Sequence, residues 1–152
     1  TNSTHLKMFV KLVRYMEKRQ ITVVPFMGPF ASVVYKAMNS EQKYAYIDET
    51  LKKLKENNIS VWDLQNLKKI NSSDCEFLDG DHGGEVTMMR ILLYLYKKIN
   101  DNEHPLKKFI KATDLEKNIK KYNGLSAIPN SDIYKNPEVD FLHLGCSKKN
   151  PQ

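Results

Sequence analysis

Two stretches in the first half of the chain place apolar residues at helical spacing. The segment "HLKMFVKLVRYMEKRQ" carries lysine and arginine opposite an apolar face made by Leu6, Phe9, Val10, Val13 and Met16. This pattern predicts an amphipathic helix over residues 5–19. The segment "EQKYAYIDETLKKLKEN" repeats the spacing at Tyr44, Ile47, Leu51 and Leu54. It predicts a second helix, with Ser40 as its N-cap and Asn57 and Asn58 at its end.

Each of these predicted helices is followed by a short apolar run rich in β-branched residues. "ITVVPF", residues 21–26, shows no polar alternation and predicts a strand buried on both faces, ended by Pro25 and the "MGP" that follows. "ISVWDL", residues 59–64, predicts a second buried strand. A strand, a crossover helix and another strand at this separation form a right-handed parallel unit, the building block of layered α/β folds.

The second half of the chain is mainly helical in pattern. "EVTMMRILLYLYKKIN", residues 85–100, has helical apolar spacing, and "PLKKFIKATDLEKNIKKY", residues 105–122, predicts one more helix started by Pro105. From Gly124 the pattern becomes irregular. We therefore predict an α/β domain over residues 1–100 and a helical, then irregular, extension over 101–152.

Composition adds limits to this outline. A chain of 152 residues that is 41% hydrophobic can form one domain with its own core. The net charge of +6 comes from lysine, because only three of the 24 basic residues are arginines. This favours a solvated lysine surface over nucleic-acid binding. A polyanion-binding module is a further hypothesis, and the net charge is its only support. No apolar run is long enough to predict a membrane span.

Cys75 and Cys146 do not have the spacing of metal ligands, and no other residues supply it. We therefore predict no metal site and no cofactor. A disulfide between the two cysteines and a pair of free thiols both fit the sequence, which leaves the cellular compartment open.

The best candidate for chemistry is "FLDGDHGG", residues 77–84. Asp79 and His82 lie three residues apart in a loop beyond a predicted parallel strand, at the sheet edge where sites assemble in α/β folds. A carboxylate beside an imidazole fixes its tautomer and stabilises the imidazolium. The same residues also suit a plain turn, with Asp81 or Gly84 capping the next helix. The octapeptide alone favours the turn.

The order of these segments changes that balance. "ITVVPFMGP", a helix, "NNISVWDLQNL", a polar loop and "CEFLDGDHGGEVTMMRILLYL" together resemble the carboxyl-terminal half of the SGNH (GDSL-like) hydrolase superfamily, over about residues 5–99. The resemblance implies part of a three-layer α/β/α flavodoxin-like fold, with Asp79 and His82 as acid and base of a Ser/His/Asp triad. It implies an acyl ester or acylated carbohydrate as substrate and an extracytoplasmic location. The nearest branches are those tied to acyl transfer and polysaccharide esterification.

One part of the family's pattern does not occur in this chain. The nucleophilic serine of the family lies in a GDS block, and none is present ahead of residue 21. We expect the missing amino-terminal half of the fold to be the partner that supplies it. Ser32 lacks the surroundings of a nucleophile elbow, and the resemblance implies a place on the substrate side. Asp63, at the end of the second predicted strand, suits a substrate-binding residue and equally a cap of the turn that follows. The predicted function is thus an ester hydrolase or acyltransferase portion. The alternative is a non-catalytic binding or structural domain derived from the same fold.

Overall fold

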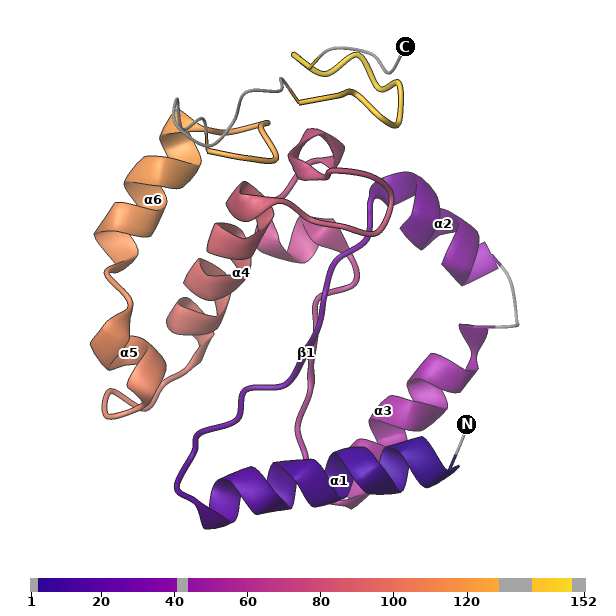
Figure 1. Ribbon diagram of the computed structural model, residues 1–152, viewed down its shortest axis with the longest axis vertical. Coiled ribbons are helices and arrows are strands. Elements are labelled where there is room, and N and C mark those ends of the chain that lie inside the picture. The colour runs from indigo at the N-terminus through magenta and orange to yellow at the C-terminus, as the bar shows by residue number, and fades with distance from the viewer. Residues whose placement is uncertain (1–2, 41–43, 129–137, 149–152) are drawn as a thin grey trace. The chain divides into compact units, whose positions relative to one another are not determined.

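The computed structural model describes residues 3–40, 44–128 and 138–148. Helices make up most of the described elements, and Figure 1 labels them along the chain. The label η marks a short 3-10 helix. The protein is of mixed helix and strand composition, and its described strands form one two-stranded parallel sheet. The elements are α1 Ser3–Lys18, β1 Phe26–Met27, α2 Ser32–Ser40, α3 Tyr46–Glu56, β2 Trp62–Asp63, η2 Leu67–Ile70, η3 Asp74–Glu76, α4 Glu85–Lys98, α5 Pro105–Phe109 and α6 Ala112–Lys121.

The chain divides into two compact units. The first unit comprises Thr1–Met27 and Lys36–Asp63, and the second comprises Gly28–Tyr35 and Leu64–Gln152. In the first unit α1 packs on α3 through a small core of Val13, Leu54 and Ile59. The parallel strands pair Phe26 with Trp62 and Met27 with Asp63.

The predicted first strand is much shorter than its apolar run. Only Phe26–Met27 is strand, and Ile21 and Phe26 are 47% and 38% exposed, so burial on both faces is wrong for this segment. Pro25 has no N–H to donate, and its carbonyl accepts a hydrogen bond from the Trp62 amide at 3.0 Å. Pairing therefore begins at Pro25, where the prediction ended it. The second predicted strand is confirmed only at Trp62–Asp63.

The helix after the first strand also differs from the prediction. Ser40 does not cap α3; it ends α2, and its hydroxyl donates to the Ala37 carbonyl at 2.8 Å. The predicted stop of α3 at Asn57 and Asn58 is confirmed, with Asn58 in the left-handed region at a φ of 55°. Residues 41–43 lie outside the described part of the chain.

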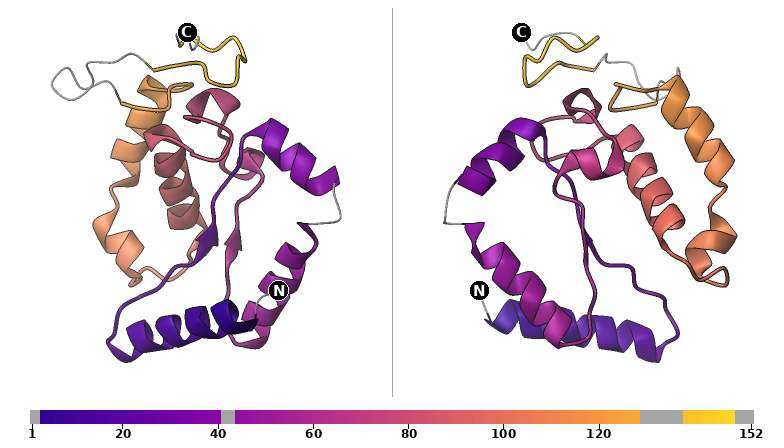
Figure 2. Two further views of the ribbon diagram at one scale, coloured as in Figure 1. Left: turned by 45° about the vertical axis from the view of Figure 1, so that its right-hand side comes forward. Right: turned by 180° about the vertical axis from the view of Figure 1, so that it is seen from behind.

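In the second unit α4 and α6 lie side by side, and both views in Figure 2 show this arrangement. Val86 and Met89 of α4 and Ile119 of α6 form a buried cluster, so helices on either side of residue 100 share one core. The predicted helix over 85–100 is confirmed, and Pro105 starts a helix as expected. The single helix predicted from there is wrong, because the chain breaks at Ile110 and Lys111, both extended, between α5 and α6.

Gly84, which precedes α4, has no room for a side chain. A Cβ built there would overlap the backbone of Ser126, whereas one built on Gly28 would meet nothing within 4 Å. We expect Gly84→Ala to lower the free energy of unfolding by at least about 2 kcal/mol, since backbone cannot move aside as a side-chain tip can. Gly28→Ala is the matched control and should change it by less than about 0.5 kcal/mol. Urea denaturation of both variants checks this; equal stability would contradict the packing described.

Candidate functional site

The site loop, residues 77–84, is closed at its base by backbone hydrogen bonds. The Gly84 amide donates to the Glu76 carbonyl at 2.9 Å and the Leu78 amide to the His82 carbonyl at 2.8 Å. Phe77 and Gly83 form an isolated antiparallel bridge. Asp79, Gly80 and Asp81 therefore form the tip of a short hairpin-like loop that runs directly into α4.

At the tip, the Asp79 carboxylate organises the residues that follow it. Its Oδ1 accepts hydrogen bonds from the backbone amides of Asp81 and His82, both at 2.8 Å. The His82 Nδ1 lies 2.8 Å from Oδ2 and 3.0 Å from Oδ1 of the same carboxylate. One acid thus shapes the turn and orients the imidazole. The predicted pairing of Asp79, rather than Asp81, with His82 is what the structure shows.

The contact through Nδ1 decides what the other ring nitrogen can do. A neutral imidazole that donates its Nδ1 proton to Asp79 carries an unprotonated Nε2, which is the nitrogen that can accept a proton. The His82 side chain is 73% exposed and that of Asp79 is 36% exposed. The pair is thus reachable from solvent, and its Nε2 can act as a base toward a group brought to it.

Each partner shifts the pKa of the other. Hydrogen bonding to Asp79, followed by its charge, raises the pKa of His82. The Asp81 amide, and then the contacts with His82, lower the pKa of Asp79 against a smaller opposing effect of burial. The stabilisation tied to His82 is complete below its ordinary value near 6.5 and is lost as pH rises through the raised pKa. That tied to Asp79 is complete above about 3.9 and is lost as pH falls through the lowered pKa. Both contributions are present together from about pH 4 to 6.5.

The loop rests on a buried ion pair that the sequence prediction missed. Glu76 is completely buried, and the Arg90 guanidinium holds its carboxylate in two contacts, at 2.7 and 2.8 Å. The Ser72 hydroxyl and the Gly124 amide donate to the same carboxylate at 2.8 and 3.2 Å. A sequence signal existed: Arg90 is one of three arginines and stands inside the apolar run "MMRILL". Its partner could not be identified from the chain alone.

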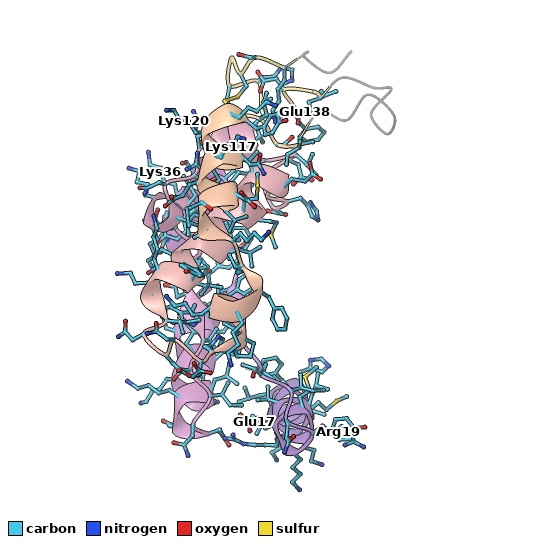
Figure 3. All side chains as sticks on the ribbon, turned by 90° about the vertical axis from the view of Figure 1, so that its left-hand side faces the viewer. Glu17, Arg19, Lys36, Lys117, Lys120 and Glu138 are labelled. Atoms are coloured by element: carbon cyan, nitrogen blue, oxygen red, sulfur yellow. A yellow bond between two sulfur atoms is a disulfide. The ribbon has the colours of Figure 1, made fainter. Side chains whose placement is uncertain are left out.

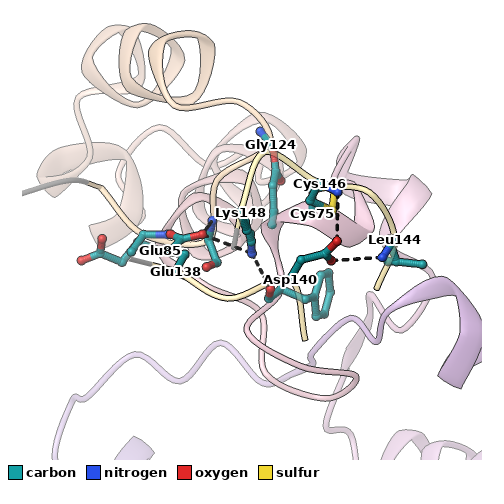
Figure 4. Close-up of polar contacts among 12 residues, drawn as sticks. Cys75, Glu85, Gly124, Glu138, Asp140, Leu144, Cys146 and Lys148 are labelled. Atoms are coloured by element: carbon teal, nitrogen blue, oxygen red, sulfur yellow. Dashed lines mark hydrogen bonds and ion pairs between the residues drawn. A yellow bond between two sulfur atoms is a disulfide. The ribbon is translucent and has the colours of Figure 1, made fainter. Parts of the chain in front are cut away.

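A second missed support is the C-terminal strap, which we define as residues 138–148. A disulfide joins Cys75 to Cys146, which settles the alternative left open by the sequence (Figure 4). The Lys148 side chain is 2% exposed, and its ammonium donates to the Phe77 carbonyl at 2.8 Å and lies 3.2 Å from the Glu138 carboxylate. The strap is therefore fixed to both residues that flank Glu76.

Two carboxylates shape the strap itself. Asp140 accepts backbone hydrogen bonds from Leu144, Gly145 and Cys146 at 3.1, 2.8 and 3.2 Å. Burial opposes ionisation of Glu138, but donors from Ser126, Ala127 and Lys148 outweigh it and lower the pKa of this carboxyl. The strap is thus held by ionised groups as well as by the disulfide.

The two residues assigned to the substrate side, Ser32 and Asp63, lie in elements outside the site loop that holds Asp79 and His82. Ser32 begins α2, where its amide donates to the Asp74 carboxylate at 2.5 Å, and the preceding Ala31 amide donates to the Gly80 carbonyl at 3.0 Å. Ser32 is therefore one residue from a contact with the site loop, although no hydrogen bond joins it to His82 within the described ranges. Asp63 lies in β2 of the first unit and is half-buried.

The described residues contain no group of three or more side chains suited to hold a metal ion. Within the same ranges, no helix has both the length and the apolar character needed to cross a membrane. No model of a known protein family, no curated protein and no solved structure matches this chain.

Proposed function

We propose that this chain is the acid and base portion of an SGNH-like ester hydrolase or acyltransferase. The observation that carries the proposal is the contact between His82 Nδ1 and the Asp79 carboxylate, at 2.8 Å, with the imidazole open to solvent. In the proposed reaction a serine from outside these residues attacks an acyl ester. His82 Nε2 takes the serine proton and later returns it to the leaving group, while Asp79 stabilises the imidazolium.

Several further observations support this proposal. The strands β1 and β2 are parallel and are separated by helices, which suits a piece of a layered α/β/α fold. The site loop leads directly into α4, in the order that the resemblance requires. Disulfides such as Cys75–Cys146 persist in oxidising compartments, which agrees with the proposed extracytoplasmic location.

The test is an esterase assay on the full-length gene product that carries this chain, with p-nitrophenyl acetate as substrate. We expect His82→Gln to lower kcat/KM by roughly 10²- to 10⁴-fold, the range of general acid–base catalysis. His5→Gln is the matched control, because His5 is an exposed residue of α1, and it should leave the rate unchanged. An active protein in which His82→Gln has no effect would contradict the assignment.

A non-catalytic binding or structural domain is the second candidate. Two observations favour it: Asp79 is already employed in shaping the turn, and the His82 side chain is largely exposed rather than enclosed. A fluorophosphonate probe separates the two candidates, since it labels an activated serine. Labelling of the full-length protein that is lost in His82→Gln supports catalysis, and absence of labelling supports the second candidate.

A further inference from the structure

We propose that a cleft between η2, α4 and α6 binds a small anionic amphiphile, meaning an apolar chain or ring that carries a phosphate or carboxylate. This inference is independent of the proposed function. The cleft consists of two adjacent hollows of about 330 and 370 Å³. Small-molecule sites begin at about this volume. Both hollows are lined by Arg90, Leu93, Lys97 and Ile119.

The charge around this cleft is strongly one-sided. Its lining includes five cationic side chains, Lys69, Arg90, Lys97, Lys98 and Lys120, and one carboxylate, Glu116. Like charges gathered within a Debye length repel one another and create a positive potential that concentrates anions. The cleft therefore attracts a negative group.

The contacts of these cations leave part of that charge available. Lys97 forms an ion pair with Glu116 at 2.7 Å. The Arg90 guanidinium donates hydrogen bonds to the Glu76 carboxylate and to the Asn123 side chain. Lys98 lies with its ammonium 5.8 Å from the Tyr94 ring, and neither Lys98 nor Lys120 contacts a carboxylate in the part of the chain that the structure describes. Lys117 and Lys120 mark the last turns of α6 in Figure 3. Lys98 lines one hollow and Lys120 the other, and we assign the binding of the anion to these two side chains.

The apolar part of the ligand is inferred from the lining between these cations. Leu93 is half-buried, and Ile70 and Ile119 are buried, with 4% and 8% of their surfaces exposed. They belong to the packing between η2, α4 and α6, so they form a fixed apolar lining rather than a mobile one. An inorganic anion would satisfy the lysines and leave the exposed parts of the half-buried Leu93 and Tyr94 side chains in water, whereas an amphiphile covers both.

Isothermal titration calorimetry tests the proposal with three probes, each kept below its critical micelle concentration where it has one. Octyl phosphate carries both features, inorganic phosphate only the anion, and octyl glucoside only the apolar chain. We expect one octyl phosphate to bind per chain, roughly tenfold or more tighter than either other probe, and more weakly as salt rises. Equal binding of inorganic phosphate or of octyl glucoside would overturn the proposal, as would no binding of octyl phosphate.

Paired variants show where the probe binds. Lys98→Gln with Lys120→Gln should weaken octyl phosphate binding by roughly tenfold. The matched control is Lys52→Gln with Lys55→Gln on α3, which makes the same charge change on exposed residues of the first unit, and it should leave the affinity within about twofold. If both pairs weaken binding equally, the effect is one of net charge and the cleft is not the site.

Discussion

Replacing Arg90 with methionine is expected to lower the free energy of unfolding by about 3–5 kcal/mol, because it leaves the Glu76 carboxylate ionised and buried without its cation. Glu76 is fully buried and the Arg90 side chain is 12% exposed, so water cannot take over the lost contacts. The carbonyl of Glu76 also accepts hydrogen bonds from the Gly84 amide and the Thr87 hydroxyl, at 2.9 and 3.1 Å. Loosening Glu76 should therefore release the base of the site loop.

Lys97→Met is the matched control for this variant, since it removes a cation from the same helix. Its ion pair with Glu116 has side-chain exposures of 58% and 49%, and exposed pairs contribute less than about 1 kcal/mol. Denaturant titrations of both variants give the comparison. Arg90→Met and Lys97→Met with equal stability would show that the buried pair does not support the second unit.

Removing the disulfide with Cys75→Ser and Cys146→Ser is expected to lower the free energy of unfolding by about 4 kcal/mol. The cysteines are 71 residues apart, and cross-linking a loop of that length restricts the unfolded chain by about this amount. The folded protein also loses the link between the strap and the segment just before the site loop. We expect faster amide hydrogen exchange at residues 74–84 in the variant.

Reduction of the unchanged protein provides the control for this effect. A reductant such as tris(2-carboxyethyl)phosphine should lower the stability of the unchanged protein to that of the double variant and should leave the variant itself unaffected. If the reduced thiols react with a maleimide while stability stays constant, the disulfide does not stabilise the fold.

These supports explain which parts of the structure could be predicted. Three helices could be predicted from their periodicity: α1, most of α3, and α4. Each buries one face against a neighbour, and the spacing of its own apolar residues identifies that face. The Asp79 and His82 contact could be predicted because both residues lie within one short loop. Local information was sufficient in each case.

Several of the misses share one physical cause, which is that a distant residue decides the local structure. Helix α2 includes two β-branched valines and was not predicted, and the Asp74 carboxylate, 42 residues later, binds its first amide. The partners of Glu76 and Lys148 lie 14 and 71 residues away, at Arg90 and Phe77. Strand length failed for the same reason, because pairing depends on which neighbour is present rather than on β propensity.

Asp79 holds His82 with its proton on Nδ1, which leaves Nε2 able to act as a base. Long-range ¹H–¹⁵N correlation spectra of histidine-labelled protein, recorded across a pH titration, measure this directly. We predict that the neutral form of His82 is protonated on Nδ1, that its pKa is raised above the ordinary value near 6.5, and that Asp79→Asn removes both properties. A His82 protonated on Nε2, with a pKa that Asp79→Asn leaves unchanged, would show that Asp79 does not hold the imidazole in this way.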